Sequence, residues 1–160
     1  MTDTAEHELV EVRLLGVPIA LRERSTQHGD ELLREMTLIA QQAVDDGDVP
    51  ARLVQLATEV RDTYSQFTLN ANAEMDAAAE AGIASVDVVY RVPRSVAGMC
   101  RHILDVIEEA DAYCRQGQYL LTLATPPDVL AYQRWIVGEF IRQPGGEAPI
   151  PWGEYEGSPR

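Results

Sequence analysis

The stretch that decides the fold prediction is VDVVYRVPRSVAGMCRHILDVIEEADAYCRQGQYLLTL, residues 86–123. It starts with an apolar, β-branched strand that Pro93 closes, and Ser95 then caps a long helix that ends at Gln116. Residues 119–123 form a further short apolar strand. A strand, helix and strand of this total length are typical of a βαβ unit, so we expect a parallel pair joined by a right-handed crossover.

The chain before this stretch predicts another strand and another helix. Residues 9–15 alternate, with Val10, Val12 and Leu14 on one face and charged side chains on the other. Residues 19–44 have helical spacing, and we expect a break or bend near Gly29 because glycine costs about 1 kcal/mol in a helix interior.

The helix that starts at Pro50 has the clearest amphipathic stripe of the chain. Asn70 and Asn72 are expected to divide this segment, because asparagine favours helix caps over helix interiors. A second piece should then end at Gly82. The stripe steps by three and four residues and comprises Leu53, Leu56, Val60, Tyr64, Phe67 and Ala71.

The last helix is predicted to begin with a cap at Thr125 followed by Pro126, Pro127 and Asp128. We assign residues 1–143 to a single globular domain and residues 144–160 to a Pro/Gly-rich C-terminal tail. The fold class is α/β and helix-rich, with four long helices around a small mixed sheet of about three strands and one βαβ unit.

The tail carries Ile150 and Trp152 among prolines and glycines. It could pack against its own domain or be presented to a partner as an extended peptide. We favour packing in cis, because exposed large apolar side chains promote aggregation.

The charge balance excludes several functions. The chain of 160 residues has 13 basic residues, all arginine, and 26 acidic ones, for a net charge of −13. Without lysine there is no P-loop, no lysine Schiff base and no kinase-type phosphate lysine. So acidic a chain repels nucleic acid and anionic membranes, and we expect it to bind neither.

The two cysteines indicate a compartment. Cys100 and Cys114 lie about 21 Å apart along one predicted helix, too far for a disulfide. Reduced thiols, a polar N-terminus without signal-peptide character and the lack of a long apolar run predict a soluble cytoplasmic protein.

The sequence spacing of the Cys and His residues does not fit a catalytic pair or a metal site. Cys100 and His102 are two positions apart on a helix and point to different sides, so they cannot form a catalytic pair. No His or Cys spacing of a metal site is present. We therefore assign no catalytic residue, cofactor or metal ligand, and rank an enzyme that uses His28 and scattered carboxylates as a third hypothesis.

An anion site is conceivable at the start of the long helix within residues 86–123. Arg91, Arg94, Ser95 and Arg101 gather there, and helix N-termini and arginine forks both attract phosphate or carboxylate groups. The alternative is that these arginines pair with the many nearby acids.

Four stretches of the sequence are similar to a family of small uncharacterised actinobacterial proteins. The similarity extends over residues 12–152 and is carried by residues 31–35, 109–114, 120–127 and 134–140. Members resemble companions of the anti-sigma kinase, antagonist and serine-phosphatase genes of partner-switching stress signalling. The resemblance implies a regulatory role and supplies no catalytic motif.

The leading functional hypothesis is a non-enzymatic regulatory or adaptor protein that acts through protein–protein contacts in stress or sigma-factor signalling, as a homodimer. Candidate surfaces are the helix of residues 53–67, the His28 region and the tail, with His28, Arg134, Trp135 and Trp152 as partner-binding residues. The alternative is a sensor of a small anionic metabolite or nucleotide, bound at the four residues around Ser95.

Overall fold

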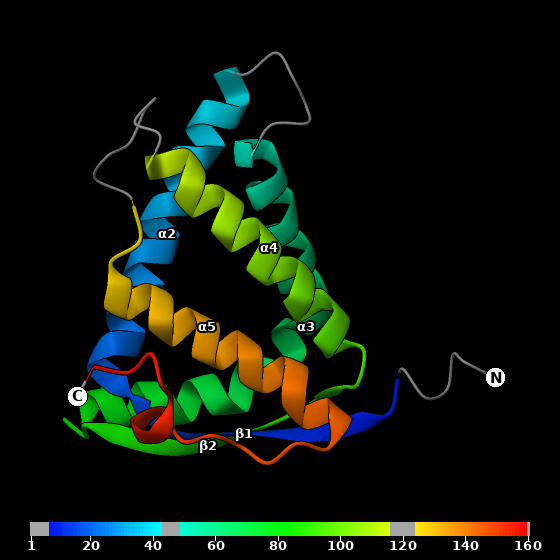
Figure 1. The fold of residues 1–160 in the computed structure, drawn as a ribbon, viewed down its shortest axis with the longest axis vertical. Helices are drawn as coiled ribbons and strands as arrows, with labels where there is room; N and C mark the ends of the chain where they lie inside the picture. Colours follow the sequence, from blue (N-terminus) through cyan, green and yellow to red (C-terminus); the bar gives the residue numbers. More distant parts are fainter. Residues whose placement is uncertain (1–6, 43–48, 116–123, 160) are drawn as a thin grey trace.

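The computed structural model describes residues 7–42, 49–115 and 124–159. In these residues four α-helices stand on a two-stranded antiparallel sheet, and the C-terminal residues run along that sheet (Figure 1). The elements are β1 (Leu9–Pro18), α2 (Ile19–Gln42), α3 (Val49–Glu80), β2 (Ser85–Pro93), α4 (Val96–Arg115), α5 (Pro127–Arg142) and the 3-10 turns η1 (Gln143–Gly145) and η2 (Trp152–Glu154).

The sheet pairs β1 with β2, from Leu9 opposite Pro93 to Pro18 opposite Ser85. A bulge interrupts the register between Leu14 and Val17, and Gly16 within it has a φ of +71°, a value that favours glycine. The extra residue shifts the alternation, so that Val12, Leu14 and Val17 are all buried.

The predicted α/β class with a three-stranded sheet and a βαβ unit is wrong. The partner of β2 is the N-terminal strand β1, and the pairing is antiparallel. The expected third strand, residues 119–123, lies outside the described residues. Close to where the chain is next described, Thr125 contacts His28 of α2. A short apolar run does not by itself distinguish a strand from other buried segments, and length alone suggested the βαβ unit.

The two long helices are continuous where breaks were predicted. Helix α2 passes through Gly29, and α3 passes through Asn70 and Asn72. The asparagine side chains are exposed, whereas Ala71 between them is buried in the core. Tertiary packing therefore outweighs the weak local preference against helix. The predicted stop at Gly82 is confirmed, because its φ is +69° and the following Ile83 N–H donates to the carbonyl of Ala78.

The C-terminal tail packs against its own domain, as the sequence favoured. Trp152 and Tyr155 pack on the core, and the ring of Trp152 is tilted by 59° against that of Trp135, with ring centroids 5.4 Å apart. The indole N–H of Trp135 donates to the carbonyl of Ile150 over 2.7 Å. No described helix is both apolar enough and long enough to cross a membrane.

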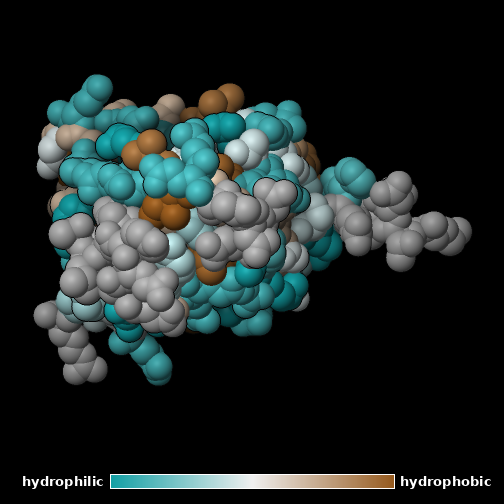
Figure 2. All heavy atoms as spheres, turned by 90° about the horizontal axis from the view of Figure 1, so that it is seen from above, coloured by the Kyte–Doolittle hydropathy of each residue, from teal (hydrophilic) through white to brown (hydrophobic). Residues whose placement is uncertain are grey.

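The buried side chains form two clusters. One lies between the sheet, α5, the C-terminal half of α3 and the tail, and has Trp135 at its centre. The other lies farther from the sheet, between α2, α3 and α4, around Met36 and Val106. Seen from the end opposite the sheet, apolar patches are visible between hydrophilic side chains (Figure 2). The cluster around Met36 has fewer buried residues than the one around Trp135, and it borders the cavity described next.

Candidate functional site

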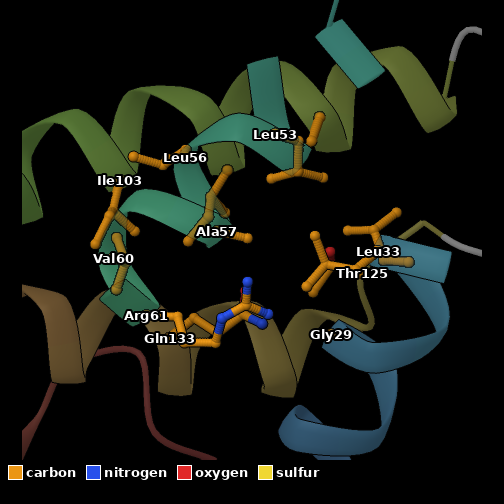
Figure 3. Close-up of a pocket in the computed structure, with 13 residues that line it drawn as sticks. Gly29, Leu33, Leu53, Leu56, Ala57, Val60, Arg61, Ile103, Thr125 and Gln133 are labelled. Carbon is orange, nitrogen blue, oxygen red and sulfur yellow. The ribbon is translucent and has the colours of Figure 1, made fainter. Parts of the chain in front are cut away.

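An apolar cavity of about 370 Å³ lies among the four helices (Figure 3). Its volume is within the usual range of small-molecule sites, about 300–1,000 Å³. The wall is mainly aliphatic and comprises Gly29, Leu32, Leu33, Leu53, Leu56, Ala57, Val60, Ile103, Ile107 and Ala110, with Arg61, Thr125 and Gln133 as its polar members.

The α3 stripe builds most of one wall. Leu53, Leu56 and Val60 repeat at helical spacing and line the cavity together with residues of α2 and α4. On α2 the wall includes Gly29, where an added side-chain carbon would meet no atom within 4 Å. A residue without a side chain thus leaves space that a larger residue would occupy.

Thr125 is the buried one of the three polar residues that the structure describes on the cavity wall. Its backbone N–H donates to Oδ1 of Asp111 over 3.1 Å, and its hydroxyl lies 3.1 Å from Nε2 of His28. Asp111 is itself buried and pairs with Arg115 at 2.9 Å. This polar seam joins α2, α4 and the start of α5, so Thr125 serves as a junction between helices. It is not the predicted helix cap, since Pro126 occupies the cap position.

His28 is the titratable group of this seam. Burial lowers the pKa of His28 from its ordinary value, and the negative charges of Glu31 and Asp111 partly oppose that shift. The neutral imidazole is therefore favoured beside Thr125, where either ring tautomer can complete the hydrogen bond.

The predicted anion site does not line this cavity. Arg91 is exposed on β2, opposite Glu11, and Arg101 is exposed on α4. Arg94 donates to the carbonyl of Pro144 and pairs with Glu8 at 3.1 Å, so its guanidinium holds the tail and the N-terminal strand region together. Ser95 is exposed in the turn before α4. Ligand binding by these four residues stays a prediction.

The predicted partner-binding residues occupy different environments. Trp135 is 1% exposed and belongs to the core, and Trp152 is partly buried against it. His28 is half-buried at the seam. Arg134 is exposed and pairs loosely with Glu108, at 3.5 Å. In this conformation Arg134 is the one of the four whose side chain is exposed.

Other reactive groups are few in the described part of the chain. Cys100 is a buried free thiol whose pKa burial raises to about 12, so it is a poor nucleophile. Among residues 7–42, 49–115 and 124–159, no three His, Cys, Asp or Glu side chains are placed to hold a metal ion.

Sequence reasoning named parts of this site without assembling them. The stripe of residues 53–67 and the His28 region were proposed as separate surfaces, and they meet at one cavity. The contact of His28 with Thr125 joins residues 97 apart in the chain, and no local pattern signals it. A usable hint was that His28 lies on the apolar face of its helix.

Comparisons of the chain with protein-family models, curated proteins and solved structures found no significant match. The resemblance to companions of partner-switching genes therefore stays a prediction.

Proposed function

We propose that this protein is a regulatory sensor that binds a small, mainly apolar molecule in the cavity between α2, α3, α4 and α5. The observation that carries the proposal is the cavity itself: about 370 Å³, with an aliphatic wall on which the described residues place three polar side chains. Sites for small molecules have this composition, with a few polar groups that fix the orientation of the ligand.

The energetics favour an occupant. The aliphatic side chains lack dispersion contacts on the side that faces the cavity, whereas close packing would supply them. A ligand that buries apolar surface there gains about 25 cal/mol per Å². Because such a ligand binds only the folded chain, it also raises the stability of the fold. The walls come from four helices, so occupancy can alter how those helices pack, which is what a sensor requires.

Binding of a neutral apolar fluorophore tests this proposal. The small fluorophore 1-naphthylamine emits at shorter wavelength in apolar surroundings and should bind the native protein saturably, with one site per chain. Replacing Ala57 with Phe inserts a ring into the cavity wall. The matched control is Ala73→Phe, which adds the same ring at an exposed position of the same helix.

We expect A57F to weaken binding of the fluorophore by about tenfold or more, which corresponds to about 1.4 kcal/mol, and A73F to bind as the parent does. Both variants must first show cooperative unfolding. The absence of saturable binding to the parent protein, or equal affinities of A57F and A73F, would contradict the proposal.

A partner-binding adaptor is the second candidate function. The observation that favours it is exposed side chains that could contact a partner: Arg134 on α5, Leu38 on α2 and Leu69 on α3, the two leucines being 49% and 66% exposed. The charge reversal Arg134→Glu should reduce capture of a stoichiometric partner. The control is Arg52→Glu, which removes another exposed, ion-paired arginine. Equal capture by the two variants would remove Arg134 from the partner surface.

The regulatory proposal also includes a cellular setting. A buried free thiol at Cys100 fits the reducing cytoplasm, and the resemblance implies a role in stress signalling. The proposed homodimer is tested by light scattering of the purified protein, which must give twice the mass of one chain.

A further inference from the structure

The charge on the cavity wall is opposite to that of the protein. The chain has twice as many acidic as basic residues, and yet among the residues that the structure describes Arg61 is the one charged residue on the wall, with no acid beside it there. A cation at the edge of an apolar site attracts an anionic group of the ligand. The local field therefore favours a ligand that combines an apolar body with a negative charge.

The guanidinium of Arg61 is weakly engaged. Its ion pair among the described residues is with the adjacent Asp62 at 3.6 Å, and both side chains are mostly exposed. By contrast, Arg22 and Arg115 hold carboxylates at 2.8 and 2.9 Å. Arginine has five N–H donors in a planar fork, so Arg61 retains donors that a ligand carboxylate or phosphate can use.

Gln133 of α5 supplies a second donor. Its amide nitrogen has one long contact, 3.4 Å to the hydroxyl of Ser25. Both Arg61 and Gln133 line the cavity, and Figure 3 shows them along the same edge of it, with nitrogen atoms directed toward the space. Two donors from two helices suit the two oxygens of a carboxylate.

The volume limits the size of the ligand. At about 30 Å³ per non-hydrogen atom, the share of liquid volume of a water molecule, the cavity of about 370 Å³ accommodates roughly a dozen such atoms. A nucleotide is larger than this and has a polar base and sugar that the aliphatic wall would leave without hydrogen bonds.

We infer that the ligand is an amphipathic carboxylic acid of roughly a dozen non-hydrogen atoms, whose apolar body fills the cavity and whose carboxylate is held by Arg61 and Gln133. This inference rests on the proposed function, because it names the chemistry of the molecule that the same cavity binds.

Competition against the bound fluorophore shows whether the charge of a ligand contributes to its affinity beyond its apolar chain. The competitors share one chain length: decanoate, 1-decanol and decyltrimethylammonium, all below their micellar concentrations. We expect decanoate to displace the fluorophore at a concentration about tenfold or more below that of decanol, since hydrogen bonds to a charged group are the stronger ones. The preference should shrink as salt is added, because Arg61 is exposed.

Two variants test whether Arg61 causes the preference for decanoate over decanol. Arg61→Gln should reduce the affinity for decanoate by about tenfold and leave that for decanol unchanged. The control Arg34→Gln removes the same charge from an exposed position of α2 that is not on the cavity wall, and should retain the preference.

The outcomes distinguish the two proposals. If the fluorophore does not bind at all, the proposed function fails. If it binds but decanoate and decanol compete equally, if R61Q and R34Q behave alike, or if the ammonium compound competes best, the carboxylate inference alone is overturned.

Discussion

Replacing the buried Glu139 with Ala is expected to destabilise the sheet end of the fold. Glu139 is 1% exposed, and its carboxylate accepts hydrogen bonds from Arg142, from the amide of Gln143 at 2.6 Å and from the Ile150 N–H at 3.2 Å. One turn earlier, Trp135 donates to the carbonyl of Ile150. Helix α5 therefore holds both backbone groups of one tail residue.

The magnitude follows from what each donor can do without the carboxylate. Gln143 can still donate to the carbonyl of Arg13 at 2.8 Å, and Arg142, which also pairs with Glu147, has access to water. The Ile150 N–H is left unpaired, at about 1–3 kcal/mol, and one buried methylene is lost at about 0.8 kcal/mol. Removing a buried charge returns part of this. We expect a net loss of about 1–3 kcal/mol in the free energy of unfolding.

Urea unfolding followed by tryptophan fluorescence measures this loss, because both tryptophans lie in the affected region. Glu139→Gln, which keeps the volume and one acceptor oxygen, should lose about half as much and remains measurable if E139A does not fold. The control is Glu108→Ala, which removes an exposed carboxylate from a loose ion pair and should change stability by less than about 0.5 kcal/mol. A loss in E139A no larger than that of E108A would refute the reasoning.

Three further predictions concern the tail, the seam and the thiol. Trp152→Ala should lower the free energy of unfolding by about 2–3 kcal/mol, because its ring packs on the core; an unchanged urea midpoint would contradict this. Because the pKa of His28 is lowered in the folded state, the unfolded chain binds more protons near that pKa, so stability should fall as the pH drops below about 6.5. His28→Gln should flatten this slope, and identical slopes would count against it. In a Cys114→Ser background, Cys100, whose pKa burial raises to about 12, should react with a disulfide reagent about 100-fold more slowly in the native than in the urea-unfolded protein; equal rates would exclude its burial.

The sequence predicted the elements better than it predicted their breaks and partners. The two strands, the helix after Ser95 and the stop at Gly82 depend on local signals, namely alternation, capping and a positive φ. The break at Gly29 failed because one glycine costs only about 1 kcal/mol, less than a long helix gains from packing on both sides. The parallel sheet failed because strand pairing is a long-range choice, and β1 was the partner that no spacing revealed.

The site was the least predictable part, because it is a cavity between helices and no sequence motif marks it. A cavity depends on where four helices fail to fill the volume between them, and that depends on their crossing geometry rather than on any single stripe. Leu56 and Val60 belong to the amphipathic stripe that the sequence analysis offered as a partner surface, and in the structure they line the cavity. Arg61 follows Val60 directly and belongs to no pattern that the sequence analysis used.

The two ends of the fold differ in how many of their polar groups are hydrogen-bonded and in how closely their apolar side chains pack. At the sheet end, Glu139, Gln143 and Trp135 hold β1 and the tail through hydrogen bonds, and aromatic rings fill the space between. At the other end, a thin cluster around Met36 borders a cavity whose junction is the contact of His28 with Thr125. Elements that respond to ligands come from the less stable part of a protein, and close packing at one end allows the other to remain underpacked. A ligand in the cavity would therefore stabilise α2 and α4 more than the sheet, and hydrogen exchange should slow first in those two helices.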